Sequence, residues 1–358
     1  MTFLQKYWAS LSVALLTITA FLAHLYNISF QCLQIDEQYT AMVVTNHTLP
    51  YVIKYAITQD CNPPLYYMAA WFSSQIFYEV SPSSLRLPAI IFCALLVPVY
   101  YFVGKELHSK LAGILTGAAT ICMFPYWYYA QDARAYTLVL LLFGCFIYYY
   151  IKLYRGDKTR WVIFAGSLFA ALCLYAHYYS IVPILILLGI LMIKDKAIGF
   201  IEFIQMAILT VPLIWSLQWI PQRPLAAFGI YAFTPDKLLL YTPYELLGMS
   251  IAILIPLILY AYFKAEDPLI KVFIGASVLS WLSTIPLGQL TLIAPRYILL
   301  LSPLLVLCAM IPVAEFIKKR KTVAQKVIIA GGLLFFILAL NCTAIMTWLT
   351  FSYCNYII

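Results

Sequence analysis

Charged residues and histidines are scarce in this 358-residue sequence. Lys, Arg, Asp and Glu together make up 10% of the chain, histidine occurs four times, and hydrophobic residues account for 64%. A water-soluble domain of this composition would lack the polar surface needed to cover itself. The scarcity of charge therefore excludes an ordinary soluble protein and indicates that lipid is the solvent.

The signatures of several other classes of protein are also missing. The nine cysteines form no CxxC pair and the histidines are widely separated, so neither a zinc motif nor a disulfide framework is indicated. The net charge of +8 comes from short, scattered basic clusters. Such clusters are typical topology signals of membrane proteins, and we expect no nucleic-acid partner.

Long apolar runs dominate the sequence instead. A bilayer core of about 30 Å requires roughly 20 apolar residues per helix, and a lipid-exposed backbone must satisfy its own hydrogen bonds. We therefore predict an all-α, polytopic transmembrane helical bundle of about eleven spans. The predicted spans cover residues 8–29, 86–104, 110–126, 136–153, 161–177, 181–194, 198–219, 246–263, 271–287, 296–315 and 327–349.

Segment 64–79 is short and partly polar, and it is interpreted either as a twelfth span or as an interfacial helix. If it lies flat, the basic clusters after Lys6 all share the side of Lys6, which the positive-inside rule makes cytoplasmic. If it crossed, Lys6 would oppose every later cluster. We therefore predict an interfacial helix over 65–79, in a multi-pass protein of the cell membrane with a cytoplasmic N-terminus. The polar stretches then expected on the outer face are 30–63, 130–135, 220–245 and 288–296.

Two adjacent acids, Asp36 and Glu37, follow the first predicted span. Ionised groups at a membrane boundary are costly unless they are used, paired or solvated, and these two could simply be solvated loop carboxylates. Further polar motifs occur on the same predicted face. They are Asn62-Pro63-Pro64-Leu65-Tyr66-Tyr67, Arg86-Leu87-Pro88, Gln131-Asp132-Ala133-Arg134-Ala135-Tyr136 and Ala294-Pro295-Arg296-Tyr297.

In this order, the motifs resemble those of polyprenyl-phosphate-sugar glycosyltransferases of the GT-C superfamily, such as the protein O-mannosyltransferases and the lipid A aminoarabinose transferase. The resemblance covers roughly residues 1–180 together with 294–297. It implies a single domain, 1–358, with a catalytic module over 1–180 and a variable helical part over 181–358. It also implies an extracytoplasmic, inverting transfer of a monosaccharide to a protein, lipid or glycan acceptor.

The resemblance assigns roles to individual residues. Asp36 matches the aspartate that acts as general base, Glu37 the acid beside it, and Asp132 an acid of the second outer loop. Asn62 stands where relatives more often have His or Lys, which puts a cation from this position in doubt. The residues assigned to substrate binding are Asn62, Tyr66, Tyr136, His177 and Tyr297.

The chemistry of such a transfer points to the same residue types. A carboxylate must accept the proton of the attacking hydroxyl, and cations must stabilise the departing phosphate, for which the planar fork of Arg is well suited. The phosphate ligands predicted, in order of preference, are Arg134, Arg296, Arg86 and Lys54.

Each of these basic residues also has a structural interpretation. Arg86 could pair with an acid and Arg134 could neutralise Asp132, while Arg223 and Lys237 could be solvated loop charges. We expect no metal cofactor, although Asp36, Glu37 and Asp132 together would suit a divalent cation.

Two other classes of function remain open. A transporter or lipid-sugar flippase predicts broken helices and ionisable residues near the bilayer midplane, whereas the acids here concentrate in outer loops. A noncatalytic subunit of a membrane complex is the second alternative. The adjacent acids Asp36 and Glu37 favour an enzyme that uses a lipid-linked donor.

Overall fold

The computed structural model describes residues 3–45, 47–58, 62–216, 235–290 and 294–350, and every regular element in these ranges is a helix. The predicted all-α membrane bundle is therefore confirmed. The helices are α1 (Phe3–Leu25), α2 (Ile35–Val44), α3 (Leu49–Thr58), α4 (Leu65–Phe77), α5 (Pro82–Leu107), α6 (Lys110–Cys122), α7 (Phe124–Ala130), α8 (Tyr136–Tyr154), α9 (Arg160–Ala176), η1 (Tyr178–Ser180), α10 (Ile181–Lys194), α11 (Lys196–Ser216), α12 (Pro235–Leu247), η4 (Gly248–Ser250), α13 (Ile251–Lys264), α14 (Pro268–Leu290), η5 (Pro295–Leu301), α15 (Ser302–Lys318) and α16 (Val323–Thr350).

Eight helical segments in the described ranges are long and apolar enough to cross a membrane, or nine if the bent pair α6 and α7 forms one span. This number is lower than the eleven spans predicted. The difference lies in α9 and α10, which are apolar but only 17 and 14 residues long. At 1.5 Å per residue they reach about 26 and 21 Å, short of a bilayer core of about 30 Å.

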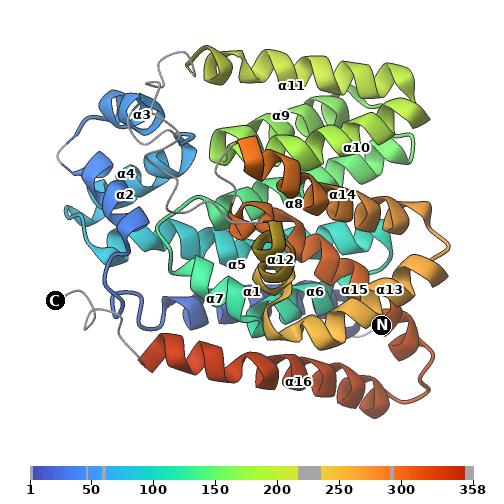
Figure 1. Ribbon diagram of the computed structural model, residues 1–358. Coiled ribbons are helices and arrows are strands. Elements are labelled where there is room, and N and C mark those ends of the chain that lie inside the picture. The colour runs from blue at the N-terminus through green and yellow to red at the C-terminus, as the bar shows by residue number, and fades with distance from the viewer. Residues whose placement is uncertain (1–2, 46, 59–61, 217–234, 291–293, 351–358) are drawn as a thin grey trace.

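The long helices run side by side, and ion pairs among the described residues lie near both ends of the bundle. Figure 1 shows the N-terminus at one end and the short helices α2, α3 and α4 grouped at the other. At the N-terminal end, Arg155 pairs with Asp267 at 2.7 Å and Lys158 pairs with Asp195 at 2.5 Å. The opposite end carries the acids and arginines that the sequence analysis selected.

Helix α4 corresponds to the segment that was predicted to lie in the interface. It has 13 residues and so a length of about 20 Å, which is too short to cross a bilayer core. It begins after Pro64, whose ring restricts the preceding chain, and it packs beside α2, α3 and α5. A non-crossing helix is what the topology argument requires, while the interfacial position of α4 stays a prediction.

The predicted span 110–126 is broken at Met123, where α6 and α7 meet at 68°. Pro125 has no N–H to donate to the carbonyl of Ile121, and the indole N–H of Trp127 donates to that carbonyl at 2.8 Å instead. The backbone N–H of Phe124 donates to Oδ1 of Asn341 in α16 at 3.1 Å. Helix α16 thus satisfies a backbone group that the break would otherwise leave unpaired.

Helix α15 forms the centre of the bundle and α16 lies along its side (Figure 1). In the most apolar 18-residue stretch of the segment that contains α15, 94% of the residues are buried. In the corresponding stretch of α16, 17% are buried. Helices α5 and α6 approach each other closely at Gly104 and Gly113. A Cβ atom added to Gly104 would lie only 2.5 Å from Cα of Gly113, so a larger residue would not fit there. Small residues at such crossings allow close packing within a membrane.

One acid lies inside the bundle, which the sequence interpretation did not foresee. Glu202 in α11 is fully buried and accepts a hydrogen bond of 2.9 Å from the hydroxyl of Ser167 in α9. A Cβ atom on Gly166 would lie 2.9 Å from Oε1 of Glu202, so that glycine makes room for the carboxyl group. Ser167 lies in the middle of α9, ten residues before His177, which follows the last residue of that helix.

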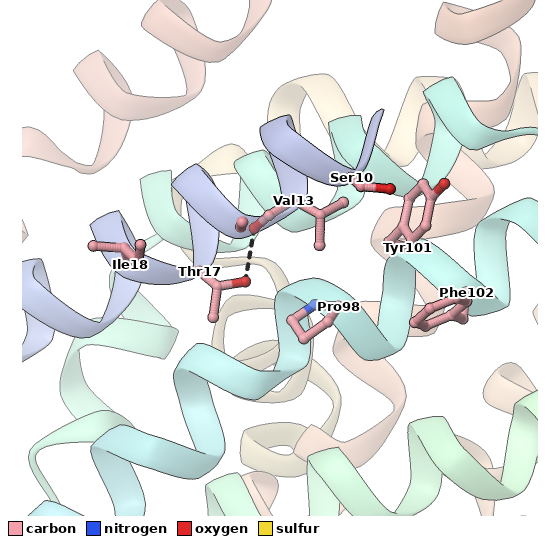
Figure 2. Close-up of a pocket in the computed structure, with 8 residues that line it drawn as sticks. Ser10, Val13, Thr17, Ile18, Pro98, Tyr101 and Phe102 are labelled. Carbon is pink, nitrogen blue, oxygen red and sulfur yellow. Dashed lines mark hydrogen bonds between the residues drawn. The ribbon is translucent and has the colours of Figure 1, made fainter. Parts of the chain in front are cut away.

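An apolar crevice of about 390 Å³ lies between α1 and α5. Figure 2 shows Val13, Thr17 and Ile18 of α1 facing Pro98 and Phe102 of α5. The hydroxyl of Thr17 donates to the carbonyl of Val13 at 2.7 Å and so adds no free polar group. None of the predicted site residues lines this crevice.

Candidate active site

The two adjacent acids occupy the first turn of α2. Asp36 and Glu37 follow Gln34, whose backbone N–H donates to Oε2 of Glu37 at 2.9 Å. Acids are favoured in this position because the first N–H groups of a helix lack backbone partners and carry partial positive charge. The same local rule therefore places both carboxylates, but their surroundings differ.

Glu37 forms a fully buried ion pair with Arg86 of α5. Nε of Arg86 donates to Oε1 at 2.7 Å and Nη2 donates to Oε2 at 2.6 Å, with both side chains inaccessible to solvent. The backbone N–H of Ala133 donates to the same carboxylate at 2.9 Å. Glu37 thereby fixes the loop between α7 and α8 relative to α2.

The remaining donors of Arg86 go to the chain that precedes α2. Nη1 donates to the carbonyls of Ile28 and Gln31, at 2.8 and 2.9 Å, and Nη2 donates to that of Cys32 at 2.9 Å. All five N–H groups of this guanidinium are therefore engaged. Such a group has no donor left for a phosphate, and the geometry favours the structural alternative considered for Arg86.

Asp36 makes a different contact, with Arg296 of η5. Nη2 of Arg296 donates to Oδ2 of Asp36 at 2.8 Å, and the two side chains are 35% and 40% exposed. Nε of Arg296 is buried and has no hydrogen-bond partner in the described ranges. The guanidinium lies 5.7 Å from the centre of the Tyr136 ring. In contrast to Arg86, Arg296 keeps unused donors beside an accessible carboxylate.

Arg134 contacts the backbone of Asp36, whereas Arg296 contacts its side chain. Nη1 of Arg134 donates to the hydroxyl of Tyr67 at 2.8 Å and to the carbonyl of Asp36 at 3.1 Å. The Arg134 guanidinium also lies 5.7 Å from the centre of the Tyr67 ring. These contacts join the loop between α7 and α8 to α2 and α4, so Arg134 and Arg296 approach Asp36 from opposite halves of the chain.

Asp132 is buried next to the Glu37 carboxylate. Its Oδ1 has no hydrogen-bond partner among the described residues. Burial, and then repulsion by Glu37, raise the pKa of Asp132 to about 7, against the opposing effect of Arg134 and Arg296. Asp132 is therefore partly protonated near neutral pH, which lets its carboxyl group donate a hydrogen bond as well as accept one.

Three ring-bearing side chains form one wall beside Arg296. His177 lies 4.9 Å from the Tyr297 ring and 6.0 Å from the Tyr136 ring. Burial, with Arg134 and Arg296 nearby, lowers the pKa of His177 to about 4, so the imidazole is neutral at physiological pH. Its Nδ1 accepts a hydrogen bond of 3.3 Å from the N–H of Tyr179, which leaves the proton on Nε2 as a donor.

Of the other predicted site residues, Tyr66 lies near the buried acids, whereas Lys54 and Asn62 lie on α3 and in the turn after it. The hydroxyl of Tyr66 is buried and donates to the carbonyl of Leu85 at 2.9 Å, which ties α4 to α5. Lys54 is exposed on α3, and Asn62 lies in the turn between α3 and α4, where its N–H donates to the carbonyl of Ala56. Arg223 and the side chain of Lys237 lie outside the residues that the structure describes.

The structure also brings in residues that the sequence analysis did not select. Glu245 of α12 accepts a hydrogen bond of 2.6 Å from the hydroxyl of Tyr129, whose ring lies 4.9 Å from that of Tyr136. The hydroxyl of Tyr128 donates to Oε1 of Gln34 at 3.0 Å. An acid at the start of an apolar run was a usable signal for Glu245. Its partner could not be foreseen, because α7 and α12 are more than 100 residues apart.

A disulfide was not foreseen either, yet Cys32, in the loop that Arg86 holds, is disulfide-bonded. A metal centre is a separate question. No group of three His, Cys, Asp or Glu side chains in the described ranges is arranged to hold a metal ion. Metal-independent chemistry therefore stays a prediction, to be tested with chelators.

Comparison with known proteins establishes the fold. No family model and no curated protein matches the sequence. Two crystal structures of ArnT from Cupriavidus metallidurans are similar to it, one bound to undecaprenyl phosphate and one in the apo state. Both are 14% identical in sequence, with TM-scores of 0.65 and 0.64, over 94% and 88% of this chain. The matched regions cover 64% and 60% of those ArnT chains, so this chain spans less than two thirds of their length.

Proposed function

We propose that this protein is a membrane glycosyltransferase that moves a monosaccharide from a polyprenyl-phosphate donor to an acceptor hydroxyl on the extracytoplasmic side. The observation that carries the proposal is the contact of 2.8 Å between Asp36 and Arg296, a carboxylate and a guanidinium brought together from positions 260 residues apart. The fold shared with ArnT, one structure of which contains undecaprenyl phosphate, supports the same class of donor.

The proposed reaction is a single displacement with inversion at the anomeric carbon. The acceptor oxygen forms a bond to that carbon while the bond from the carbon to the phosphate oxygen breaks, and the electron pair leaves with polyprenyl phosphate. Asp36 takes the hydroxyl proton as general base. Its partial exposure leaves it open to an acceptor, whereas Glu37 is enclosed.

The departing phosphate requires cationic donors, and Arg296 is best suited to supply them. Its guanidinium has unused N–H groups, and a planar fork can hold two phosphate oxygens at once. Arg134, which donates to the backbone carbonyl of Asp36, is the second proposed ligand. Arg86 and Glu37 act instead as positioning residues, because their shared hydrogen bonds hold Ala133 and the start of α2 in place.

The acceptor side of the site is proposed to lie along Asp132 and the aromatic wall. Partly protonated Asp132 would orient the acceptor hydroxyl or Asp36, and the neutral imidazole of His177 would donate from Nε2. Tyr136 and Tyr297 offer ring faces of the kind that pack against a sugar.

Two features support an extracytoplasmic site. The disulfide of Cys32 fits an oxidising compartment, since disulfides persist mainly outside the cytoplasm. The basic residues Arg155 and Lys158 occupy the opposite, N-terminal end of the bundle, as expected if that end is cytoplasmic.

The proposal is tested with purified protein, synthetic polyprenyl-phosphate sugars and a panel of hydroxyl acceptors. We expect the wild type to transfer sugar with inversion and Asp36→Asn to lose transfer by at least about a hundredfold, as removal of a general base does. Glu79→Gln, which alters an exposed acid in the loop after α4, serves as the matched control and should keep wild-type activity. Absence of transfer from every donor, or retention of the anomeric configuration, would reject the proposal.

A further inference from the structure

We infer that Trp348, in the last turn of the C-terminal helix α16, is a positioning residue that holds the two site loops in their reactive arrangement. The inference rests on the proposed function for its catalytic meaning. The structural part, that Trp348 fixes both loops, stands on contacts alone and can be tested without activity.

Trp348 is buried and makes polar contacts through both its side chain and its backbone. Its indole N–H donates to Oε1 of Gln131 at 3.1 Å, and its carbonyl accepts a hydrogen bond of 2.6 Å from Nε2 of Gln31. The indole ring lies 4.8 Å from the ring of Tyr128. One residue of α16 therefore contacts the first outer loop, α7 and the loop between α7 and α8.

These partners lead directly to the acids of the site. Gln131 precedes Asp132, and its Nε2 donates to the carbonyls of His24 and Tyr26, both at 2.8 Å. The hydrogen bond from Trp348 thus fixes the orientation of an amide whose other end already holds the end of α1. Asp132 follows that fixed amide by one residue.

The second partner reaches Glu37 through Arg86. The carbonyl of Gln31 accepts a hydrogen bond of 2.9 Å from Nη1 of Arg86, and the same guanidinium binds Glu37. Tyr128, beneath the Trp348 ring, donates to Gln34 at the start of α2. The positions of Asp132 and of the α2 acids therefore both depend on the end of α16.

Few of the residues of α16 are buried, and Trp348 is the last of them along the helix. Its buried residues form a single stripe, which consists of Ile337, Asn341, Ile345 and Trp348. Figure 1 shows α16 along the side of the bundle, with its end beside the loops of the site. Asn341 donates to the hydroxyl of Ser250 at 2.8 Å and accepts from Phe124, so it anchors the middle of the helix. Anchored there and at Trp348, α16 is positioned to brace the site loops.

The test removes one hydrogen bond and keeps the ring. Trp348→Phe deletes the indole N–H while leaving an aromatic side chain beside Tyr128. We expect kcat for transfer to fall about tenfold, while the KM for the polyprenyl-phosphate donor stays within about twofold, because the phosphate ligand Arg296 is held by contacts with Asp36 of α2 and Tyr136 of α8. Trp161→Phe, at a tryptophan that is 67% exposed on α9, is the matched control and should be silent.

Two further readouts separate positioning from a general loss of stability. The backbone N–H of Ala133, which donates to Glu37, should exchange with solvent faster in Trp348→Phe, whereas amides in the centre of α15 should not change. Gln131→Met removes the partner amide, and in a double-mutant cycle it should be non-additive with Trp348→Phe. Gln131→Met also provides the test if Trp348→Phe yields no folded protein.

The outcomes are distinct from those that test the proposed function. If the wild type transfers no sugar, faster exchange at Ala133 in Trp348→Phe would still support the positioning role. Wild-type kcat together with wild-type exchange at Ala133 would overturn it. A loss of kcat accompanied by uniformly faster exchange in all helices, or by full additivity with Gln131→Met, would overturn it as well.

Discussion

The proposed base, Asp36, and the proposed phosphate ligand, Arg296, form an ion pair with each other, and this has a measurable consequence. Oδ2 of Asp36 occupies one N–H of Arg296 at 2.8 Å. A phosphate that binds Arg296 must either displace this carboxylate or bind close to its negative charge. Asp36→Asn keeps the shape of the side chain and removes the charge, so it should bind polyprenyl phosphate more tightly than the wild type does, although it cannot serve as a base.

The magnitude follows from the exposure of the pair. Because the two side chains are 35% and 40% exposed, the ion pair that must be broken contributes at most about 1 kcal/mol. Repulsion between a phosphate and a carboxylate about 5 Å apart adds on the order of 1 kcal/mol at the high dielectric of a partly exposed site. A gain of about 1–2 kcal/mol in Asp36→Asn corresponds to roughly five- to thirtyfold tighter binding.

The assay is isothermal titration calorimetry, in which short-chain polyprenyl phosphate is added to the protein in lipid nanodiscs. The titration is carried out at low and at physiological salt. Arg296→Gln should bind more weakly than the wild type, and Glu79→Gln should bind equally well. The gain in Asp36→Asn should shrink as salt rises, because the competing charges are partly exposed. Unchanged or weaker binding by Asp36→Asn would show that the carboxylate does not compete with phosphate for Arg296.

Three further predictions concern the buried acids. Asp132 has a folded pKa of about 7, above an unfolded value near 3.9, so the folded state binds more protons between these values and stability should fall as pH rises from about 4 to 7. In Asp132→Asn this component of the pH dependence should be absent from thermal unfolding curves; an unaltered curve would contradict the assignment. Glu37→Gln leaves Arg86 buried without its counter-charge and should cost about 3–5 kcal/mol, seen as a much lower melting temperature; a melting temperature within about 2 °C of the wild type would refute that role. Glu202→Gln keeps the acceptor for Ser167 and should retain full transfer activity, whereas a large loss would show that this buried acid contributes to transfer.

The bundle could be predicted because membrane thickness constrains the sequence directly. Each span requires a long apolar run, and the chain interrupts such runs with polar clusters. The breaks were harder to foresee. Pro125 signals that α6 must end, but the bend is stabilised by Asn341, a residue more than 200 positions away inside an apolar run.

The acids of the site could be located from sequence, but the division of labour among the arginines could not. Arg86 and Arg296 each precede an apolar run, and the sequence ranks Arg296 only one place above Arg86 as a phosphate ligand. The difference is that the loop of residues 28–32 folds so that its carbonyls surround Arg86, whereas among the described residues Arg296 has a single hydrogen-bond partner, Asp36. Trp348 was hidden for the same reason, because its importance depends on contacts with distant loops.

Single-turnover transfer from a radiolabelled polyprenyl-phosphate sugar separates donor binding from the proton transfer that we propose for Asp36. Wild-type protein should convert bound donor to product, Asp36→Asn should hold the donor and leave it unreacted, and Arg296→Gln should bind too little donor to react. Product formation by Asp36→Asn at the wild-type rate would contradict the account.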